Sequence, residues 1–204
     1  MDIIPVELQS LSQWLGFMVG IISGLIVQGE AQLYFVHMFE IYSQRTKIDY
    51  DLNPLHHFDA WSIPALVFAG WTWSRKKVEE PPYFPHTALH RSLIPLAGPV
   101  ANLALVGILS TLYLFFPGSF LGTAIAANIE IALANLLVPV PPFALGRALT
   151  RPFEVLNSCR SSVDRWGAVV IGILLTAEYF GHWSLLKAWI SSIGALLYRW
   201  VVNW

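Results

Sequence analysis

The stretch NLLVPVPPFALGR, residues 135–147, closes a long apolar segment with a proline-rich turn and a single arginine. Two other stretches also set asparagine, proline and glycine or histidine among apolar residues, LNPLHHFD at 52–59 and LAGPVAN at 96–102. Within apolar segments, glycine allows helices to approach closely and proline bends them. Gly98 and Pro99 therefore predict a helix that is bent and closely packed, whereas Asn53 and Asp59 of LNPLHHFD predict a turn.

The composition indicates an integral membrane protein. Of the 204 residues, 55% are hydrophobic and only 12% are charged, whereas a soluble domain carries about 25% charged residues. The formal net charge of −1 gives no indication of nucleic-acid binding. Cys159 is the only cysteine, so an internal disulfide is excluded. Residues 1–10 lack a basic region, so we expect no cleavable signal peptide.

Three segments are long and apolar enough to cross a bilayer whose hydrocarbon core is about 30 Å thick. They cover about 8–42, 92–116 and 119–149. Residues 61–73 are apolar but too short to span, and they contain Pro64 and Gly70, which predicts a re-entrant or interfacial segment.

Two weaker apolar segments, about 166–181 and 183–202, finish the chain. We therefore expect an all-α membrane protein with a core of three transmembrane helices at 1–150, and a polar loop with two C-terminal helices at 151–204. Seven tryptophans near predicted span ends, among them Trp61, Trp71 and Trp73, indicate an aromatic belt.

The basic residues predict the orientation in the membrane. Lys and Arg gather in the loops at 43–91 and 147–165, and none lies near the turn at Pro117. The positive-inside rule places both loops on the cytoplasmic side and the N-terminus on the opposite side.

The motifs at 52–59, 96–102 and 135–147 resemble the core of the site-2 protease family, the intramembrane zinc metalloproteases. The resemblance covers about residues 20–150. It implies an H-E-x-x-H motif on the helix before the first motif and an aspartate in the last one, as in N-L-L-P-I-P-P-L-D-G-G-R. The matching positions here hold Gln28, Gly29, Gln32 and Ala144.

These four residues cannot supply the chemistry that the family uses. A catalytic zinc takes three protein ligands and one water, and the glutamate of H-E-x-x-H acts as general base. The carboxamides of Gln28 and Gln32 are weak zinc ligands, Gly29 offers no base, and Ala144 offers no third ligand. On this basis we expect no metal, no other cofactor and no enzyme activity, that is, a pseudoprotease.

Other residues of the family pattern are retained. Asn53 and His57 match its L-N-P-L-x-H-x-D loop, Asn102 matches A-G-P-x-x-N, and Asn135 begins the last motif. The resemblance implies that such asparagines help to hold an unwound segment of a substrate. We therefore expect either a retained scaffold alone or a groove that binds a transmembrane partner.

The interpretation is a catalytically inactive intramembrane protease homologue, acting in the lipid bilayer as a structural or assembly subunit that binds other membrane proteins of a larger complex. The helices at 166–204 are the expected partner face. One alternative is an active metalloprotease with a relocated metal site at Glu30, His37 and Glu130. Another is a pigment- or lipid-binding subunit with His37 or Gln28 as axial ligand. The spaced pair His86 and His90 is interpreted as interfacial.

Overall fold

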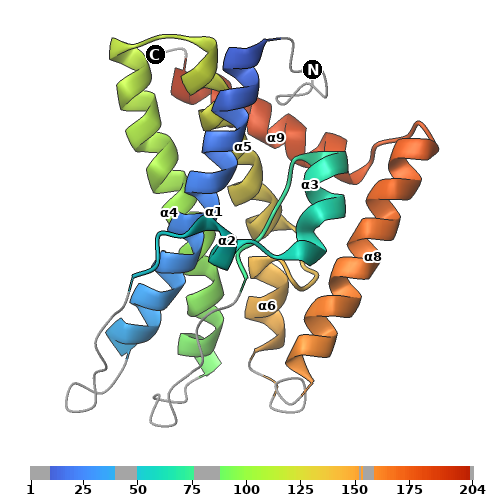
Figure 1. The fold of residues 1–204 in the computed structure, drawn as a ribbon. Helices are drawn as coiled ribbons and strands as arrows, with labels where there is room; N and C mark the ends of the chain where they lie inside the picture. The colour runs from blue at the N-terminus through green and yellow to red at the C-terminus, as the bar shows by residue number, and fades with distance from the viewer. Residues whose placement is uncertain (1–9, 40–49, 76–87, 152, 154–158, 203–204) are drawn as a thin grey trace.

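The computed structural model describes residues 10–39, 50–75, 88–151, 153 and 159–202 (Figure 1). Within these ranges the chain is mainly helical and forms no β-sheet; its one isolated β-bridge joins Phe58 to Ser74. The expected all-α membrane class is therefore confirmed. The side of the membrane on which each loop lies stays a prediction, as does the division into two domains.

Three helices are long and apolar enough to cross a membrane: α1 (Leu11–Phe39), α4 (Ala88–Phe115) and α5 (Ser119–Leu137). The three-span core is thus confirmed, but the third span is shorter than expected. It ends at Leu137, and the short α6 (Ala144–Thr150) follows after a turn. Pro141 and Pro142 lie in that turn and have no N–H to continue a helical hydrogen-bond ladder.

Helices α1 and α5 pack with almost no space between their backbones. Three glycines of α1 make this approach, and a Cβ on any of them would lie within 3.0 Å of an α5 atom. The contacts pair Gly16 with Phe120, Gly20 with Ala124 and Gly24 with Asn128. The residue numbers rise together, so the two helices run parallel. The Asn128 side chain also donates from Nδ2 to the carbonyl oxygen of Gly20, at 3.1 Å.

The segment expected to be re-entrant folds into a hairpin whose two ends lie side by side. It consists of a 3-10 turn, η2 (Ala60–Ser62), followed by α3 (Ile63–Ala69). Gly70 ends α3 with a φ of 74°, in the left-handed region that favours glycine. The chain then runs back as an extended return strand, residues 71–74, until Ser74 pairs with Phe58. This hairpin does not span, as the sequence predicted.

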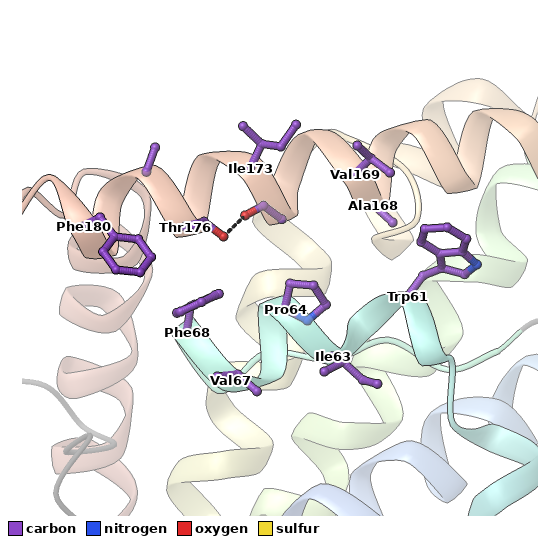
Figure 2. Close-up of a pocket in the computed structure, with 12 residues that line it drawn as sticks. Trp61, Ile63, Pro64, Val67, Phe68, Ala168, Val169, Ile173, Thr176 and Phe180 are labelled. Carbon is purple, nitrogen blue, oxygen red and sulfur yellow. Dashed lines mark hydrogen bonds between the residues drawn. The ribbon is translucent and has the colours of Figure 1, made fainter.

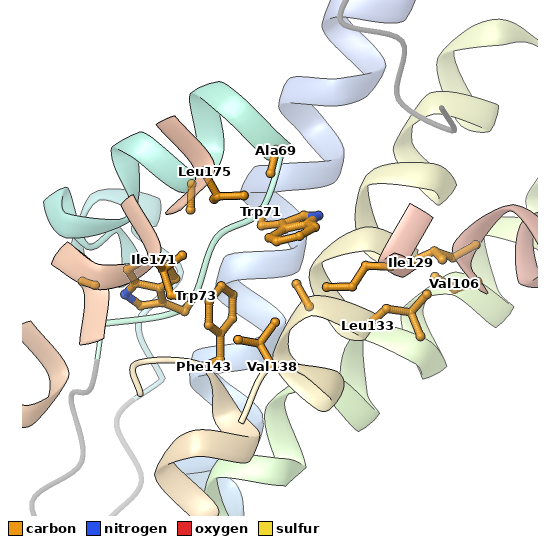
Figure 3. Close-up of a cluster of buried hydrophobic side chains, with 14 of the residues drawn as sticks. Ala69, Trp71, Trp73, Val106, Ile129, Leu133, Val138, Phe143, Ile171 and Leu175 are labelled. Atoms are coloured by element: carbon orange, nitrogen blue, oxygen red, sulfur yellow. The ribbon is translucent and has the colours of Figure 1, made fainter. Parts of the chain in front are cut away.

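The return strand contributes two large side chains to the main hydrophobic core (Figure 3). Trp71 and Trp73 are 0% and 1% exposed, and both rings pack edge-on against Phe143, with centroids at 6.4 and 5.1 Å. Trp71 also donates from Nε1 to Glu130 on α5, at 3.0 Å. The assignment of these two tryptophans to an aromatic belt is therefore wrong, because both are buried among protein side chains.

The two C-terminal helices cover the core from outside. Helix α8 (Arg160–Phe180) packs against α3, and α9 (Leu186–Val202) packs against α5 (Figure 1). Glu178, near the end of α8, binds the first turn of α9. Its Oε1 accepts from the backbone N–H groups of Leu185 (3.1 Å) and Leu186 (2.7 Å), and its Oε2 from that of Lys187 (3.4 Å).

Replacing this cap should loosen α9. Glu178→Ala leaves the N–H groups at the start of α9 without their acceptor, so we expect the free energy of unfolding to fall by about 1–3 kcal/mol. Denaturation of the purified protein in mixed micelles would measure it. Glu178→Gln keeps one acceptor oxygen and should lose less. Equal losses for both variants would show that the carboxylate does not cap α9.

Candidate functional site

Gln28 and Gln32 of α1 lie side by side against α4. They are 1% and 5% exposed, and a Cβ on Gly98 would lie 2.5 Å from Gln28 Cγ and 2.9 Å from Gln32 Nε2. Pro99 of the same helix has no N–H to donate to the carbonyl of Pro95. Gln32 Nε2 takes that place, donating to the Pro95 oxygen at 3.5 Å. Gln32 therefore supplies the donor that the α4 backbone lacks at Pro99.

Gly29, between them, is in contact with His57. A Cβ on Gly29 would lie 2.2 Å from His57 Nδ1 and 2.8 Å from Ser74 Oγ. The imidazole is completely buried, at 0% exposure. His57 ends α2 (Pro54–His57), and Asn53 caps this turn by accepting from the Leu55 N–H at 3.1 Å. His57 and Ser74 therefore fill the space into which a side chain at position 29 would point.

Glu30 and His57 form the ionisable pair of this site. Glu30 Oε1 lies 3.2 Å from His57 Nε2 and also accepts from the backbone N–H of Asp51 at 3.2 Å. His57 Nε2 also contacts the carbonyl oxygen of Asp51. Because Nε2 faces two acceptor oxygens, it carries the hydrogen. Glu30 Oε1 is thus held by two donors, while Oε2 has no protein partner among the described residues.

The retained asparagines have different surroundings. Asn53 is exposed and serves as a helix cap. Asn135 is buried and donates from Nδ2 to the carbonyls of Thr72 (2.9 Å) and Ile131 (2.9 Å), while its Oδ1 accepts from the Ala144 N–H at 3.2 Å. Asn102 is 0% exposed, and neither of its polar atoms has a partner within the described part of the chain. Asn102 is therefore the asparagine with hydrogen-bonding capacity to offer a ligand.

Ala144 is the first residue of α6 and lies beside Asn135. The return strand connects α6 to the surroundings of His57. Arg147 of α6 donates from Nη1 to the carbonyl of Ser74 at 3.3 Å, and Ser74 Oγ lies close to Gly29. We call the polar residues that line this part of α1 and the elements against it the polar site. It consists of Gln28, Gly29, Glu30, Gln32, His57, Ser74 and Gly98, together with Asn102, which follows Gly98 by one turn of α4. The sequence did not single out Glu30 and Ser74 as neighbours of His57.

The described residues do not fit a three-ligand zinc centre. No group of three or more His, Cys, Asp or Glu side chains converges within them. The relocated set is not assembled either, because Glu30 contacts His57 and Asp51 whereas Glu130 binds Trp71. The four positions of the family motif hold amides, glycine and alanine, which are weak ligands or none. His86 lies outside the described residues.

Comparison with known proteins supports a protease relationship. The chain is 27% identical to a curated protein of Bacillus subtilis (strain 168), "Putative zinc metalloprotease YwhC". The alignment covers 70% of this chain and 72% of the relative. No protein-family model and no solved structure matches the chain. These findings define a membrane-helical protein with distant similarity to a named metalloprotease.

The expectation of a non-enzyme is contradicted by this comparison. It rested on four residues, Gln28, Gly29, Gln32 and Ala144, whereas the relative's name points to a protease. Comparing only the family positions also left out a carboxylate, because Glu30 lies one residue after Gly29. These four residues change which side chains could bind a ligand or transfer a proton, and they do not establish that the protein is inactive.

The contact between Gly29 and His57 can be tested by substitution. Gly29→Ala would place a methyl group against the imidazole and Ser74, so we expect it to destabilise the protein by about 1–3 kcal/mol. Gly107→Ala on α4 is the matched control, because nothing lies within 4 Å of its Cβ position. The control should be neutral or stabilising by up to about 1 kcal/mol. Unfolding in mixed micelles measures both.

A double-mutant cycle tests whether the contact with His57 causes the destabilisation by Gly29→Ala. If the clash is with His57, Gly29→Ala should cost less in a His57→Ala background, giving a coupling of about 1 kcal/mol. Strict additivity would contradict the contact between residues 29 and 57.

Proposed function

We propose that this protein is an intramembrane protease that binds an unwound segment of another membrane protein at the polar site and hydrolyses it. The observation that carries the proposal is the Glu30–His57 pair, in which one carboxylate oxygen is fixed by two donors and the other has no protein partner. The distant relative named as a zinc metalloprotease supports the reaction class.

The geometry supports a proton-transfer role for Glu30. Carboxylates and imidazoles are the usual general acids and bases of hydrolytic enzymes. His57 Nε2 and the Asp51 N–H orient Oε1, and the buried Oε2 has no protein partner among the described residues. In hydrolysis, Oε2 would take a proton from water as the water oxygen attacks the peptide carbonyl. The same proton would then pass to the leaving nitrogen, so that one water is added across the C–N bond.

Buried amides would hold the substrate backbone. A peptide that unwinds within a bilayer loses its internal hydrogen bonds, and each unpaired group is costly in hydrocarbon. Asn102 offers a donor and an acceptor, and Gln28 offers its Oε1, which has no protein partner among the described residues. Both residues are buried, at 0% and 1% exposure. Their free hydrogen-bonding capacity matches what an unwound segment lacks.

Glu30→Gln tests this assignment. The amide oxygen can still accept from Asp51, but the side chain can no longer take a proton, so cleavage of a membrane-protein reporter should fall by about 10²–10⁴-fold. Glu130→Gln makes the same change at a buried carboxyl outside the polar site, where the oxygen can still accept from Trp71. The control should cleave at the rate of the unchanged protein, as measured by reporter fragments in reconstituted vesicles.

Two results would contradict the proposal. One is no cleavage of any membrane reporter by the unchanged protein under conditions in which a site-2 protease cleaves it. The other is cleavage that Glu30→Gln leaves intact, which would move the reaction away from the polar site.

A role as a subunit of a larger membrane complex is a second proposal, supported by the outward face of α9. Trp189 and Leu196 are 50% and 68% exposed, while Ile190, Ser191 and Gly194 of the same helix are buried against the core. The sequence suggested that small residues at 166–204 would contact a partner. Several instead pack internally, since a Cβ on Gly167 would overlap the Pro141 carbonyl. Large apolar side chains remain for a partner.

Surface changes test this role better than truncation, because removing α8 and α9 would uncover the protein's own core. Trp189→Ser with Leu196→Ser should abolish co-purification of partner membrane proteins in mild detergent. Ile108→Ser with Leu114→Ser is the matched control on α4, where both residues are 61% exposed. Equal recovery of partners by both double variants would exclude α9 as the interface.

A further inference from the structure

Two adjoining hollows lie between α3 and α8, on the outer side of the hairpin. The first is an open apolar groove of about 760 Å³ along both helices. The second is a polar pocket of about 370 Å³ at the start of α8. Trp61 lines both, so they meet at its ring. The two together form one amphipathic cavity, which we call the α3–α8 site.

The groove is apolar along its length (Figure 2). Pro64 and Phe68 of α3 face Ala168 and Phe180 of α8 across it. The hydroxyl of Thr176, which also lines it, already donates to the Gly172 carbonyl at 2.7 Å. From residue 168 to 180 the groove is about 18 Å long at 1.5 Å per residue. This length is close to one leaflet of the hydrocarbon core, about 15 Å.

The polar pocket is basic. It is lined by three arginines and two aspartates, a net charge of 3 − 2 = +1. Arg147 is paired with Asp164, with Nη2 to Oδ2 at 3.1 Å. Asp59 accepts from the Trp61 N–H (3.1 Å) and from Trp73 Nε1 (2.8 Å).

Two arginines of this pocket remain available to a ligand. Arg75 and Arg165 are exposed, and neither side chain has a carboxylate partner among the described residues. Arg165 also lies in the first turns of α8, where the helix dipole favours an anion. The pocket therefore presents two unpaired guanidinium groups at one end of an apolar groove.

We propose that the α3–α8 site binds one anionic phospholipid, with an acyl chain along the groove and the headgroup phosphate between Arg75 and Arg165. Guanidinium groups bind phosphate oxygens in bidentate fashion. Both arginines belong to the loops expected on the cytoplasmic side, whose leaflet carries the anionic lipids. This site is separate from the polar site and does not depend on the proposed hydrolysis.

The shape favours a lipid over a protein segment. A helix about 10 Å wide and 18 Å long would occupy about 1,400 Å³, roughly twice the volume of the groove. Helices α3 and α8 also touch at the groove floor, where a Cβ on Gly172 would lie 3.4 Å from Pro64. A single acyl chain needs no wider opening. Free phosphate would use the polar pocket but not the groove.

Native mass spectrometry of the detergent-purified full chain tests the proposal, with dioleoyl phosphatidylglycerol and dioleoyl phosphatidylcholine added in equal amounts. We expect one bound phosphatidylglycerol in preference to phosphatidylcholine. Arg165→Gln and Arg75→Gln should each weaken phosphatidylglycerol binding by about fivefold, the value of one cation near an anionic headgroup. Arg199→Gln, in the last turn of α9, is the charge-matched control and should change nothing.

The groove is tested separately. Ala177→Phe adds a ring within the groove, whereas Leu174→Phe adds one on the same helix outside it. Only Ala177→Phe should lower the binding of both lipids. Val67→Phe, on the α3 side where Val67 is 66% exposed, provides a second variant if Ala177→Phe does not fold. Sodium phosphate at millimolar concentration should not displace the lipid.

Three outcomes would overturn the assignment. The first is equal retention of the two lipids, and the second is equal binding by Arg165→Gln and Arg199→Gln. The third is binding of a transmembrane peptide that Ala177→Phe blocks and Arg165→Gln leaves unchanged, which would assign the groove to a protein segment. Cleavage of a reporter by the lipid-free protein would leave the proposed protease function intact, so the two proposals fail independently.

Discussion

The hydrogen bonds of Asn135 hold the centre of this structure together. One buried amide joins α5 to the return strand at Thr72 and to the first residue of α6, Ala144. Neither the strand nor the turn before α6 can satisfy its backbone through regular secondary structure, and inside a bilayer each unpaired group is costly. The strand in turn carries Trp71 and Trp73 into the core and Ser74 to His57 and Gly29. The Asn135 amide therefore positions the polar site, together with the bonds of Trp71 to Glu130 and of Arg147 to Ser74.

Much of the architecture follows from hydrophobic segment length. The three spans and the short hairpin were predictable because a bilayer requires about 20 apolar residues per crossing and residues 61–73 fall short of it. The end of the third span was not, since the apolar character continues through Pro141. The helix ends at Leu137 because Pro139 has no N–H to donate to Asn135 and favours the extended conformation of Val138. The burial of Trp71 and Trp73 was also missed. Their position near a predicted span end did not reveal that the chain turns back there into the protein.

The polar site shows how far a motif can be interpreted residue by residue. The family pattern drew attention to His57, Asn102 and Asn135, and it gave the asparagines one common role. In the structure, Asn135 bonds through both atoms of its amide and Asn53 caps a turn, whereas neither polar atom of Asn102 has a partner among the described residues. The sequence offered Glu30 only as a ligand of a relocated metal site with His37 and Glu130, and its pairing with His57 was not foreseen because it lies one residue beyond the family position. Gly29, at a position where the family resemblance implies a glutamate, was the available signal, because some other group, here His57, has to fill that space.

The glycine contacts between α1 and α5 have a mechanical consequence. The α5 backbone lies against Gly16 and Gly20, and the Asn128 side chain lies against Gly24, so the two helices cannot move closer. The bond from Asn128 to Gly20 resists sliding. The two helices therefore behave as a single rigid body that carries Glu30 and Asn135 in fixed relation. A bulky chain that enters the polar site from the bilayer has to displace something else. The elements free to move are α4, bent at its prolines, and the α3 hairpin, so sideways access is restricted to these two flanks.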